Sequence, residues 1–281
     1  MLKNLFYRFL SIILRYPWKL LYNIWSNYPF GKRPKGDKKQ YIELSQKACL
    51  INYPEVDKFE KESGFSIDSK WLDNLALHTQ VVIKESELCY AHGRVLYSTL
   101  SKYLSDNQTN SLNDTINIWE TGTARGFSSL CMAKALNDQN VSGKICTFDI
   151  LPHDKKMYWN CIDDVGGPKT RDELLTPWKS LVEKYLLFYQ GDTRFILPTL
   201  KTGRIHFAFL DGAHTYKDVL FEFSNIREHQ QTGDIIVYDD YSPEIYPGLV
   251  RAVDEICDIY NYQRIDLKAN SSRAYVIAIK K

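Results

Sequence analysis

From Thr115 onward, short apolar segments alternate with helical patterns, and this alternation restricts the fold more than any other feature of the chain. Five of these segments are predicted to be strands, at residues 116–120, 144–149, 186–190, 205–211 and 235–239. Strands that alternate with helices form a parallel sheet. Two further segments, residues 262–267 and 274–279, flank Ala-Asn-Ser-Ser and predict a hairpin. The sequence therefore predicts an α/β fold with a mostly parallel sheet and a C-terminal β-hairpin.

The chain before residue 115 is predicted to be helical. Residues 40–113 have a mostly helical, polar-faced pattern, and residues 71–103 carry apolar side chains at three- and four-residue steps without a proline. The polar, Asn-rich segment 105–114 marks a domain boundary. We therefore expect three parts: residues 1–39 (an amphipathic basic helix and a linker), 40–114 (a helical cap) and 115–281 (the domain with the sheet).

Residues 1–28 are rich in aliphatic and aromatic side chains, but basic residues recur among them. Uncharged runs such as residues 9–14 are far shorter than the roughly 20 apolar residues that a membrane-spanning helix needs. Two interpretations remain open. The segment is an interfacial helix on an anionic membrane, with peripheral contact through residues 1–39, or an amphipathic helix packed on its own domain or on a partner.

Charge and cysteine content narrow the class of protein. The formal net charge of +2 over 281 residues argues against a dedicated nucleic-acid-binding protein, which would be far more basic. The six cysteines form no C-x-x-C pair and have no zinc-site spacing. A reducing compartment is the simplest explanation, so we expect a cytoplasmic protein, at the inner membrane surface if residues 1–39 bind lipid.

The segment Ile116–Ser129 joins the first predicted strand to a helix through two glycines. Glu120 ends the strand, and Gly122 and Gly126 bracket a tight turn with the spacing E-x-G-x-x-x-G, which differs from the G-x-G-x-x-G of dinucleotide-binding proteins. Glycine lets a backbone approach a ligand closely, and the first N–H groups of the helix would face that ligand. The turn is therefore a candidate ligand-binding element.

Acidic and hydroxyl residues follow the second and third predicted strands. In open α/β sheets the ligand lies across the carboxyl ends of the strands. Asp149 ends the second strand, where a carboxylate can accept both hydroxyls of a ribose, or alternatively cap the following loop. Asp192 and Thr193 follow the third strand. They are candidates for a ligand contact at this edge or, alternatively, for the N-cap of a helix that begins near Arg194.

The fourth and fifth predicted strands end in Asp211-Gly-Ala-His214 and Asp239-Asp240. Neighbouring parallel strands would bring the three carboxylates together, where they repel one another unless they are protonated or neutralised by a cation. Oxygen ligands of this kind suit Mg²⁺, Mn²⁺ or Ca²⁺. His214 titrates near neutrality and can accept a proton. The alternatives are that Asp239 and Asp240 cap the next turn and that His214 opens a helix.

The glycine turn resembles the first motif of class I S-adenosylmethionine (SAM) methyltransferases, whose Rossmann-like sheet has seven strands. The acids resemble those of metal-dependent O-methyltransferases that act on catechols, caffeoyl esters, or macrolide and aminocoumarin sugars. The likeness covers about residues 115–281. The Asp-Gly-x-His-x-Tyr run is also typical of a broader bacterial methyltransferase group. Ala213 stands where the sugar enzymes often have an Asp that acts as the catalytic base. His214 stands where the catechol enzymes have a Lys.

This resemblance implies a function and a set of site residues. It implies a metal, Mg²⁺ or Mn²⁺, on Asp211, Asp239 and Asp240, and His214 with Asp211 as the catalytic residues. It implies SAM bound by Glu120, Gly122, Thr123, Ala124, Gly126, Ser128, Asp149, Asp192 and Thr193.

We therefore expect a SAM-dependent methyltransferase that acts on a hydroxyl of a small molecule or glycan, assisted by a divalent cation. The alternatives are a metal-independent N- or C-methyltransferase on the same fold, and a non-catalytic membrane-peripheral binding protein. The sequence is compatible with a homo-oligomer and does not fix the oligomeric state.

Overall fold

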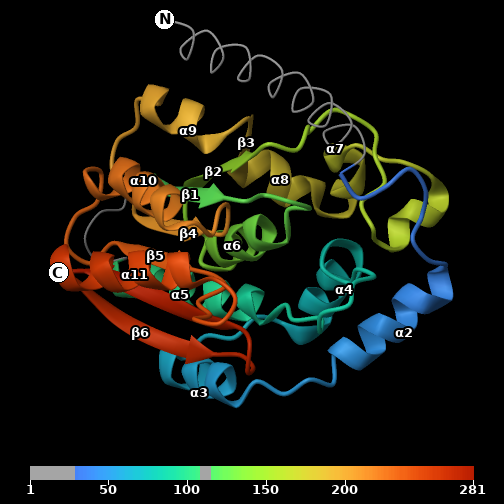
Figure 1. Cartoon of the computed structure of the whole chain (residues 1–281), viewed down its shortest axis with the longest axis horizontal. Coiled ribbons are helices and arrows are strands. Elements are labelled where there is room, and N and C mark those ends of the chain that lie inside the picture. The colour runs from blue at the N-terminus through green and yellow to red at the C-terminus, as the bar shows by residue number, and fades with distance from the viewer. Residues whose placement is uncertain (1–28, 108–114) are drawn as a thin grey trace, which may run out of the picture.

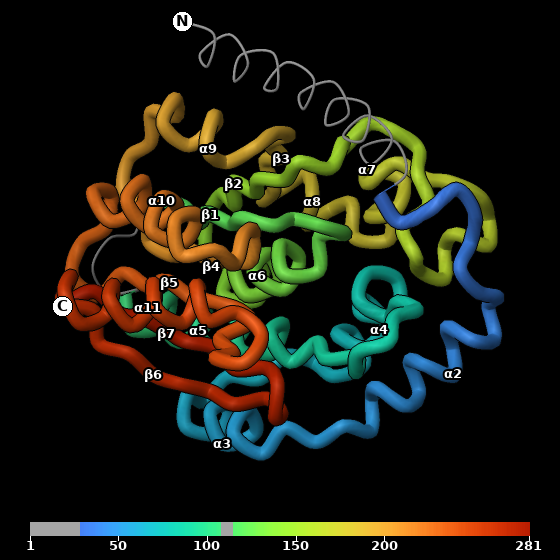
Figure 2. The backbone as a smooth tube through the Cα atoms, viewed as in Figure 1, coloured from blue at the N-terminus to red at the C-terminus, as the bar shows by residue number. Residues whose placement is uncertain are grey.

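Seven short strands form one sheet, in the order β3-β2-β1-β4-β5-β7-β6. The structure is a computed structural model that describes residues 29–107 and 115–281. Figure 1 shows the strands running from β3 at the top of the view to β6 at the bottom, and Figure 2 places β7 between β5 and β6. The strands are β1 (Ile116–Thr121), β2 (Gly143–Asp149), β3 (Leu186–Gln190), β4 (Phe207–Leu210), β5 (Ile235–Tyr238), β6 (Tyr262–Lys268) and β7 (Ala274–Lys280).

The predicted topology is confirmed. Strands β1 to β5 are parallel, whereas β7 pairs antiparallel with both β5 and β6 and so forms the predicted hairpin. Strands β4 and β5 end at Leu210 and Tyr238, so Asp211 and Asp239 lie just beyond the last strand residues. Because parallel strands end at the same edge, this edge carries all the predicted site residues that follow a strand.

Alternate residues of the strands fill two separate cores. Ile118, Phe207 and Phe209 belong to a cluster on one face, and Trp119 and Ala208 belong to a cluster on the other. This alternation is the two-residue period of a strand, and a parallel sheet that is buried on both faces has apolar residues at both sets of positions. The first face is covered by α3 (Pro54–Ser63), α4 (Ser69–Thr79), α5 (Ala91–Asn107), α6 (Phe127–Asp138) and α8 (Lys179–Tyr185), and the second by α10 (Tyr216–Arg227) and α11 (Pro247–Ile259).

The helical pattern predicted over residues 71–103 is interrupted. Helix α4 ends at Thr79 and α5 begins at Ala91, with residues 80–90 outside any helix. In the interruption, the N–H of Ile83 donates to the side-chain oxygen of Asn160 (3.1 Å), and the Asn160 amide donates to the Ile83 carbonyl (3.0 Å). A tertiary contact therefore satisfies the backbone that a continuous helix would have satisfied locally, and it overrides the apolar spacing.

The connection between β2 and β3 is a folded segment. It contains η1 (Ile162–Gly166), α7 (Arg171–Leu174) and η2 (Thr176–Trp178), and it encloses a small core around Trp159, which is fully buried. Arg125 reaches this core and donates to the Trp159 carbonyl (2.5 Å). The Trp159 ring therefore packs inside the protein. The remaining elements are α2 (Lys38–Ala48), α9 (Thr193–Ile196) and η3 (Leu197–Thr199).

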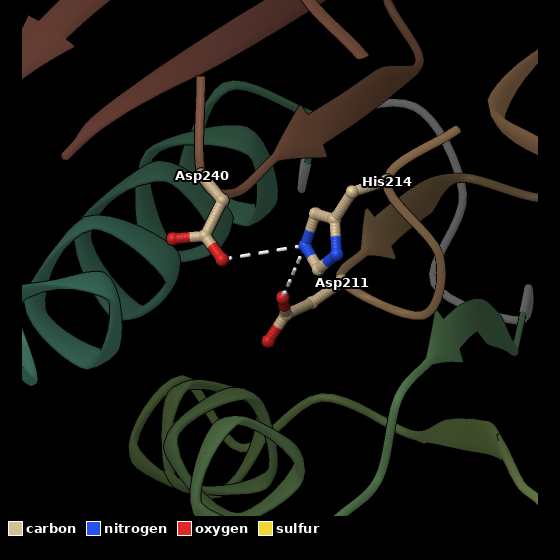
Figure 3. Close-up of side chains that lie close together, drawn as sticks. All are labelled: Asp211, His214 and Asp240. Atoms are coloured by element: carbon tan, nitrogen blue, oxygen red, sulfur yellow. Dashed lines mark ion pairs between the residues drawn. The ribbon is translucent and has the colours of Figure 1, made fainter. Parts of the chain in front are cut away.

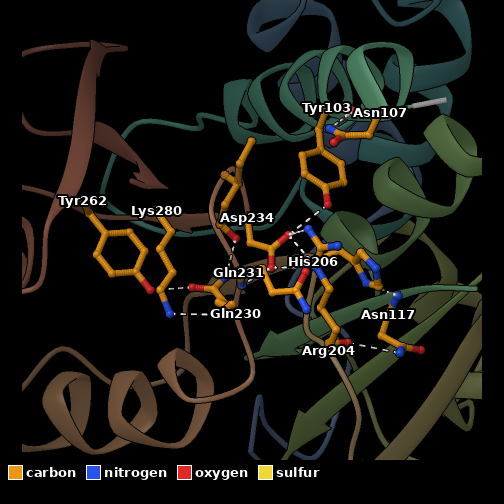
Figure 4. Close-up of polar contacts among 11 residues, drawn as sticks. Tyr103, Asn107, Asn117, Arg204, His206, Gln230, Gln231, Asp234, Tyr262 and Lys280 are labelled. Atoms are coloured by element: carbon orange, nitrogen blue, oxygen red, sulfur yellow. Dashed lines mark hydrogen bonds and ion pairs between the residues drawn. The ribbon is translucent and has the colours of Figure 1, made fainter. Parts of the chain in front are cut away.

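A polar network joins the hairpin to the amino ends of the strands, as Figure 4 shows. The carboxylate of Asp234 is fully buried and accepts hydrogen bonds from Tyr103 (2.9 Å) and Arg204 (2.7 Å). At the end of β7, the Lys280 ammonium donates to the Arg227 and Gln230 carbonyls, at 2.8 Å each. Because buried charges are stable only when they are paired, this network fixes the start of β6 and the end of β7 at the edge of the sheet opposite the predicted site.

Two predictions about the first part of the chain fall outside the described residues. The amphipathic helix expected in residues 1–28 is one, and the domain boundary expected at residue 114 is the other. Among residues 29–107 and 115–281, no helix combines the length and the apolar character needed to cross a bilayer.

Candidate functional site

A hollow of about 220 Å³ lies at the carboxyl ends of β1 to β4. Four of the predicted cofactor-binding residues line it, namely Gly122, Asp149, Asp192 and Thr193. Its other lining residues are Phe148, Ile150, Gly191, Arg194, Gly212, Ala213, Asp218 and Glu222. The hollow therefore lies at the edge of an open parallel sheet where ligands bind.

The turn after β1 is packed against the turn after β4. Gly122 has φ +91°, and a Cβ atom added to it would lie 2.3 Å from the carbonyl oxygen of Asp211. Gly126 also has a positive φ, +85°, and directly precedes α6. Both positions therefore need glycine for backbone reasons. The contact fixes the Asp211 backbone against the glycine turn, whatever ligand lies above it.

Glu120 and Ser128 lie beneath the turn and do not line the hollow. The Glu120 carboxylate is fully buried and accepts hydrogen bonds from the hydroxyls of Ser128 and Ser129 at the start of α6. Burial raises the pKa of Glu120, and the serine hydroxyls oppose that rise. Glu120 therefore ties β1 to α6, and any direct contact of its carboxylate with a ligand stays a prediction.

Asp149 reaches the hollow and also clamps the glycine turn. One carboxylate oxygen accepts from the Ala124 N–H (2.5 Å), and the other accepts from the Leu151 N–H (2.7 Å). The buried Arg171 lies 3.4 Å from Asp149 and donates to the Ala124 carbonyl (2.9 Å). Burial raises the pKa of Asp149, and Arg171 opposes that effect. Asp149 thus performs the predicted loop capping and still borders the hollow. Thr123 is buried and bonds to the Thr147 hydroxyl (2.5 Å).

Asp192 and Thr193, which follow β3, both form hydrogen bonds with other protein groups. Asp192 caps α9 through the Arg194 N–H (2.9 Å) and pairs with the Arg194 guanidinium (2.6 Å), as the capping alternative predicted. The Thr193 hydroxyl donates to Glu222 (3.1 Å), which also accepts from Thr121 (3.0 Å). Glu222 is 1% exposed, and burial raises its pKa to about 7. The sequence analysis missed this carboxyl on the wall of the hollow.

Asp211, His214 and Asp240 meet next to the hollow and form what we call the acid–histidine group (Figure 3). The His214 Nε2 lies 3.7 Å from an Asp211 oxygen and 3.3 Å from an Asp240 oxygen. The imidazole also stacks on the ring of Tyr246, with centroids 4.3 Å apart. Asp240 has φ +54°, which turns the chain sharply after β5. The predicted catalytic pair, Asp211 and His214, is therefore brought together.

The charges of the acid–histidine group are strongly coupled. Burial and the Asp239 carboxylate raise the pKa of Asp211 to about 7. Although burial alone would lower it, the carboxylates of Asp211 and Asp240 raise the pKa of His214 to about 10. His214 therefore carries a proton at neutral pH, while Asp211 is poised to exchange one. This differs from the prediction that His214 itself is a neutral proton acceptor.

Two of the three predicted metal ligands, Asp211 and Asp240, belong to a set that could hold a metal ion, and Asp239 does not. Asp239 is fully buried, and both of its carboxylate oxygens accept hydrogen bonds from Arg273, one of them at 3.0 Å. Both acids follow the end of β5, and Asp240 also contacts Arg273, with one oxygen 3.3 Å from the Arg273 Nε. The acid–histidine group, with ligand atoms within 4.8 Å of one another, is the set in the described residues that could hold a metal ion. His214 thus replaces Asp239 in the predicted set.

Arg273 was also missed by the sequence analysis, although the hairpin prediction held a signal for it. The register pairs Tyr238 with Val276, and the Tyr241 N–H donates to the Ala274 carbonyl (2.9 Å). Counting back from this pairing places Arg273 opposite the acids that follow β5. The signal needs the antiparallel register of β5 and β7, which apolar spacing alone does not specify.

Comparisons with known proteins agree with this geometry. Residues 119–241 match the model of a family described as "Methyltransferase domain". A search of curated protein sequences finds no match. The matched residues run from β1 to the end of the acid pair after β5, so they include the glycine turn, the hollow and the acid–histidine group.

Solved structures with the same fold include the following three. The O-methyltransferase NovP is 16% identical with a TM-score of 0.53, and the alignment covers 76% of this chain and 99% of NovP. Cofactor-bound Rv0187 from MTB is 16% identical with a TM-score of 0.54, covering 82% and 98%. The O-methyltransferase TomG from Streptomyces achromogenes, in complex with SAM, is 15% identical with a TM-score of 0.50, covering 77% and 92%. This chain therefore shares the fold of these structures, and residues 119–241 match the methyltransferase-domain model.

Proposed function

We propose that this chain is a SAM-dependent methyltransferase that transfers the methyl group of SAM to a hydroxyl oxygen of a small molecule or a sugar. The observation that carries the proposal is the segment Asp211–His214. Its middle residues, Gly212 and Ala213, line the hollow, and its end residues belong to the acid–histidine group. One short segment therefore borders both a site for the methyl donor and a site that can receive a proton. NovP and TomG, which share the fold, are both named O-methyltransferases.

The lining of the hollow fits a nucleoside with a charged tail. Asp149 offers carboxylate lone pairs to ribose hydroxyls, each bond to a charged acceptor contributing about 1.5–3 kcal/mol. Ile150, which follows it and is 36% exposed, offers an apolar surface to a flat ring. These residues would hold SAM, and Asp192 and Thr193 lie at the same rim.

The acid–histidine group supplies what an oxygen acceptor requires. SAM, when bound, supplies a methyl group that is already activated on a sulfonium sulfur, so the protein needs to align the reactants and remove one proton. Asp211, with a pKa raised to about 7, receives that proton on a carboxylate oxygen. His214 stays between Asp211 and Asp240 and holds their orientation. Tyr246 stacks on His214 and restricts the rotation of the imidazole.

The divalent cation implied by the sequence does not enter this proposal. One of its three expected ligands, Asp239, is paired with Arg273. In the remaining set, His214 would have to replace Asp239 as a ligand. Because the predicted ligands do not fit the ion, we assign the proton transfer to the side chains alone.

Calorimetry with S-adenosylhomocysteine tests the donor site. We expect binding to the wild-type chain, and a loss of affinity of about 10- to 150-fold in Asp149→Asn, which corresponds to 1.5–3 kcal/mol. Asp106→Asn is the matched control, because Asp106 is an exposed acid on α5 that pairs with Lys102 outside the hollow. Thermal melting without ligand separates a lost contact from a misfolded turn. A wild-type chain that does not bind the product would refute the proposal.

The acceptor class is tested by following S-adenosylhomocysteine formation with a panel of catechols, sugars and amines. We expect turnover with hydroxylated acceptors and a decrease of about 10²- to 10⁴-fold in Asp211→Asn, the range for loss of a general base. Turnover with amines alone would show that nitrogen, rather than oxygen, is methylated.

A further inference from the structure

Arg273 places a positive charge beside the acids Asp239 and Asp240 that follow β5. It lies in the turn between β6 and β7, and its guanidinium donates to both oxygens of Asp239. Its Nε lies 3.3 Å from an oxygen of Asp240, and its Nη1 donates to the Cys89 carbonyl (3.4 Å). A planar guanidinium matches the two oxygens of a carboxylate, so this pairing is directional as well as electrostatic.

Because the Asp239 carboxylate is buried, it needs Arg273 as its charged partner. The Asp239 side chain is fully buried, and the Arg273 side chain is 18% exposed. An ionised carboxylate without a partner is very unfavourable at such a site. Against the effect of burial, Asp239 raises the pKa of Arg273, so the guanidinium stays charged. Asp239 is therefore committed to Arg273 rather than available to a bound ion.

Asp240 connects Arg273 to the catalytic side. Its Oδ1 is the oxygen near Arg273, and its Oδ2 is the oxygen near His214. Asp239, Arg273, Asp240, His214 and Asp211 thus form a row in which acidic and basic groups alternate. Such a row neutralises crowded carboxylates with side chains instead of a metal. A dication placed beside Asp240 would also face the fixed positive charge of Arg273.

We propose that Arg273 is a positioning residue that takes the place of a divalent cation, by holding Asp239 away from the reacting oxygen and orienting Asp240 toward His214. This inference rests on the proposed function, because it assigns the charge balance of the same site. Methyl transfer by this chain then requires no divalent metal.

Metal binding to the full chain tests the inference without an acceptor. Mn²⁺ alone is the probe, titrated by calorimetry and by its electron paramagnetic resonance signal. We expect no submillimolar site in the wild-type chain. We expect Arg273→Met to bind Mn²⁺ about 10- to 100-fold more tightly than the wild-type chain does. This is the size of change in metal affinity that is typical when a residue that orients a ligand is altered. Arg273→Lys, which keeps the charge, should not show this gain.

Two controls identify the ligands. Arg264→Met is the matched variant, because Arg264 lies on the same hairpin and pairs with Asp254 and Asp266. It should behave like the wild-type chain. In Arg273→Met combined with Asp239→Asn, the gained site should be lost, because Asp239 is the carboxylate that Arg273 releases.

The inference is overturned if the wild-type chain binds Mn²⁺ in the micromolar range and Asp240→Asn abolishes that binding, or if Arg273→Met folds and gains no site. If Arg273→Met does not fold, the wild-type titration and the effect of EDTA on S-adenosylhomocysteine formation decide the question. Activity unchanged in EDTA supports the inference, and activity lost in EDTA rejects it. Failure of the proposed function is distinct, because the wild-type chain would then not bind S-adenosylhomocysteine at all.

Discussion

Glu222 makes the stability of this protein depend on pH in a way that one substitution should remove. Its carboxyl lies on α10 at the wall of the hollow, is 1% exposed, and accepts from the hydroxyls of Thr121 (3.0 Å) and Thr193 (3.1 Å). Burial raises its pKa from 4.5 to about 7, and the threonine hydroxyls oppose that rise. Glu222→Gln keeps the size and a carbonyl acceptor but cannot ionise.

The magnitude follows from the two pKa values. The native state holds a proton that the unfolded chain releases, so the free energy of unfolding decreases as pH rises from 4.5 to about 7. A difference of about 2.5 pH units, at about 1.4 kcal/mol each, amounts to about 3 kcal/mol. Below pH 4.5 the carboxyl is neutral in both states and contributes no pH dependence. Above pH 7 the full cost is present.

Urea denaturation at pH 5 and pH 8 measures this effect. We expect Glu222→Gln to be more stable than the wild-type chain at pH 8 by about 3 kcal/mol, and to lose most of that advantage at pH 5. Glu183→Gln is the matched control, because Glu183 is a 65% exposed acid on α8 and should leave the pH profile unchanged. Parallel pH profiles for the wild-type chain and Glu222→Gln would refute the reasoning.

Three further substitutions test the site and the network at the other end of the sheet. Gly122→Ala should lower the melting temperature and the affinity for S-adenosylhomocysteine, because the new Cβ would lie 2.3 Å from the Asp211 carbonyl; wild-type values in both assays would contradict the backbone argument. Tyr103→Phe should lower the free energy of unfolding by about 1.5–3 kcal/mol, since the hydroxyl donates to the buried carboxylate of Asp234; an unchanged value in urea denaturation would show that the bond adds nothing. His214→Gln should move the pH–rate profile of S-adenosylhomocysteine formation to higher pH, because His214 lowers the pKa of Asp211; an unmoved profile would assign the proton to another group.

Much of the fold follows from local patterns in the sequence. Short apolar strands between helical segments predict a parallel sheet, and the acids that end them must then lie at one edge. For this reason Asp149 and Asp211 could be placed correctly without coordinates. The glycine turn was predicted as a place of close approach, and Gly122 does have a near neighbour there. The neighbour is the Asp211 backbone, because the turn after β4 packs directly against the glycine turn after β1.

The features that sequence reasoning missed all depend on contacts between distant parts of the chain. Asn160 interrupts a helical pattern by bonding to Ile83, which lies 77 residues earlier. Arg273 reaches Asp239 only through the register of β7 on β5.

The segment Asp211–His214 is where the fold constrains the reaction most tightly. In the proposed reaction, its ends hold the carboxylate that accepts the proton and the imidazole, and its middle borders the hollow that we propose for the methyl donor. The Asp211 N–H donates to the Thr121 carbonyl (3.1 Å), and Gly122 abuts the Asp211 carbonyl. Backbone contacts therefore set the separation between donor and acceptor sites, rather than flexible side chains. In-line transfer loses rate steeply when the reactants are displaced by about 1 Å, so this backbone contact is as important for catalysis as the groups that handle the proton.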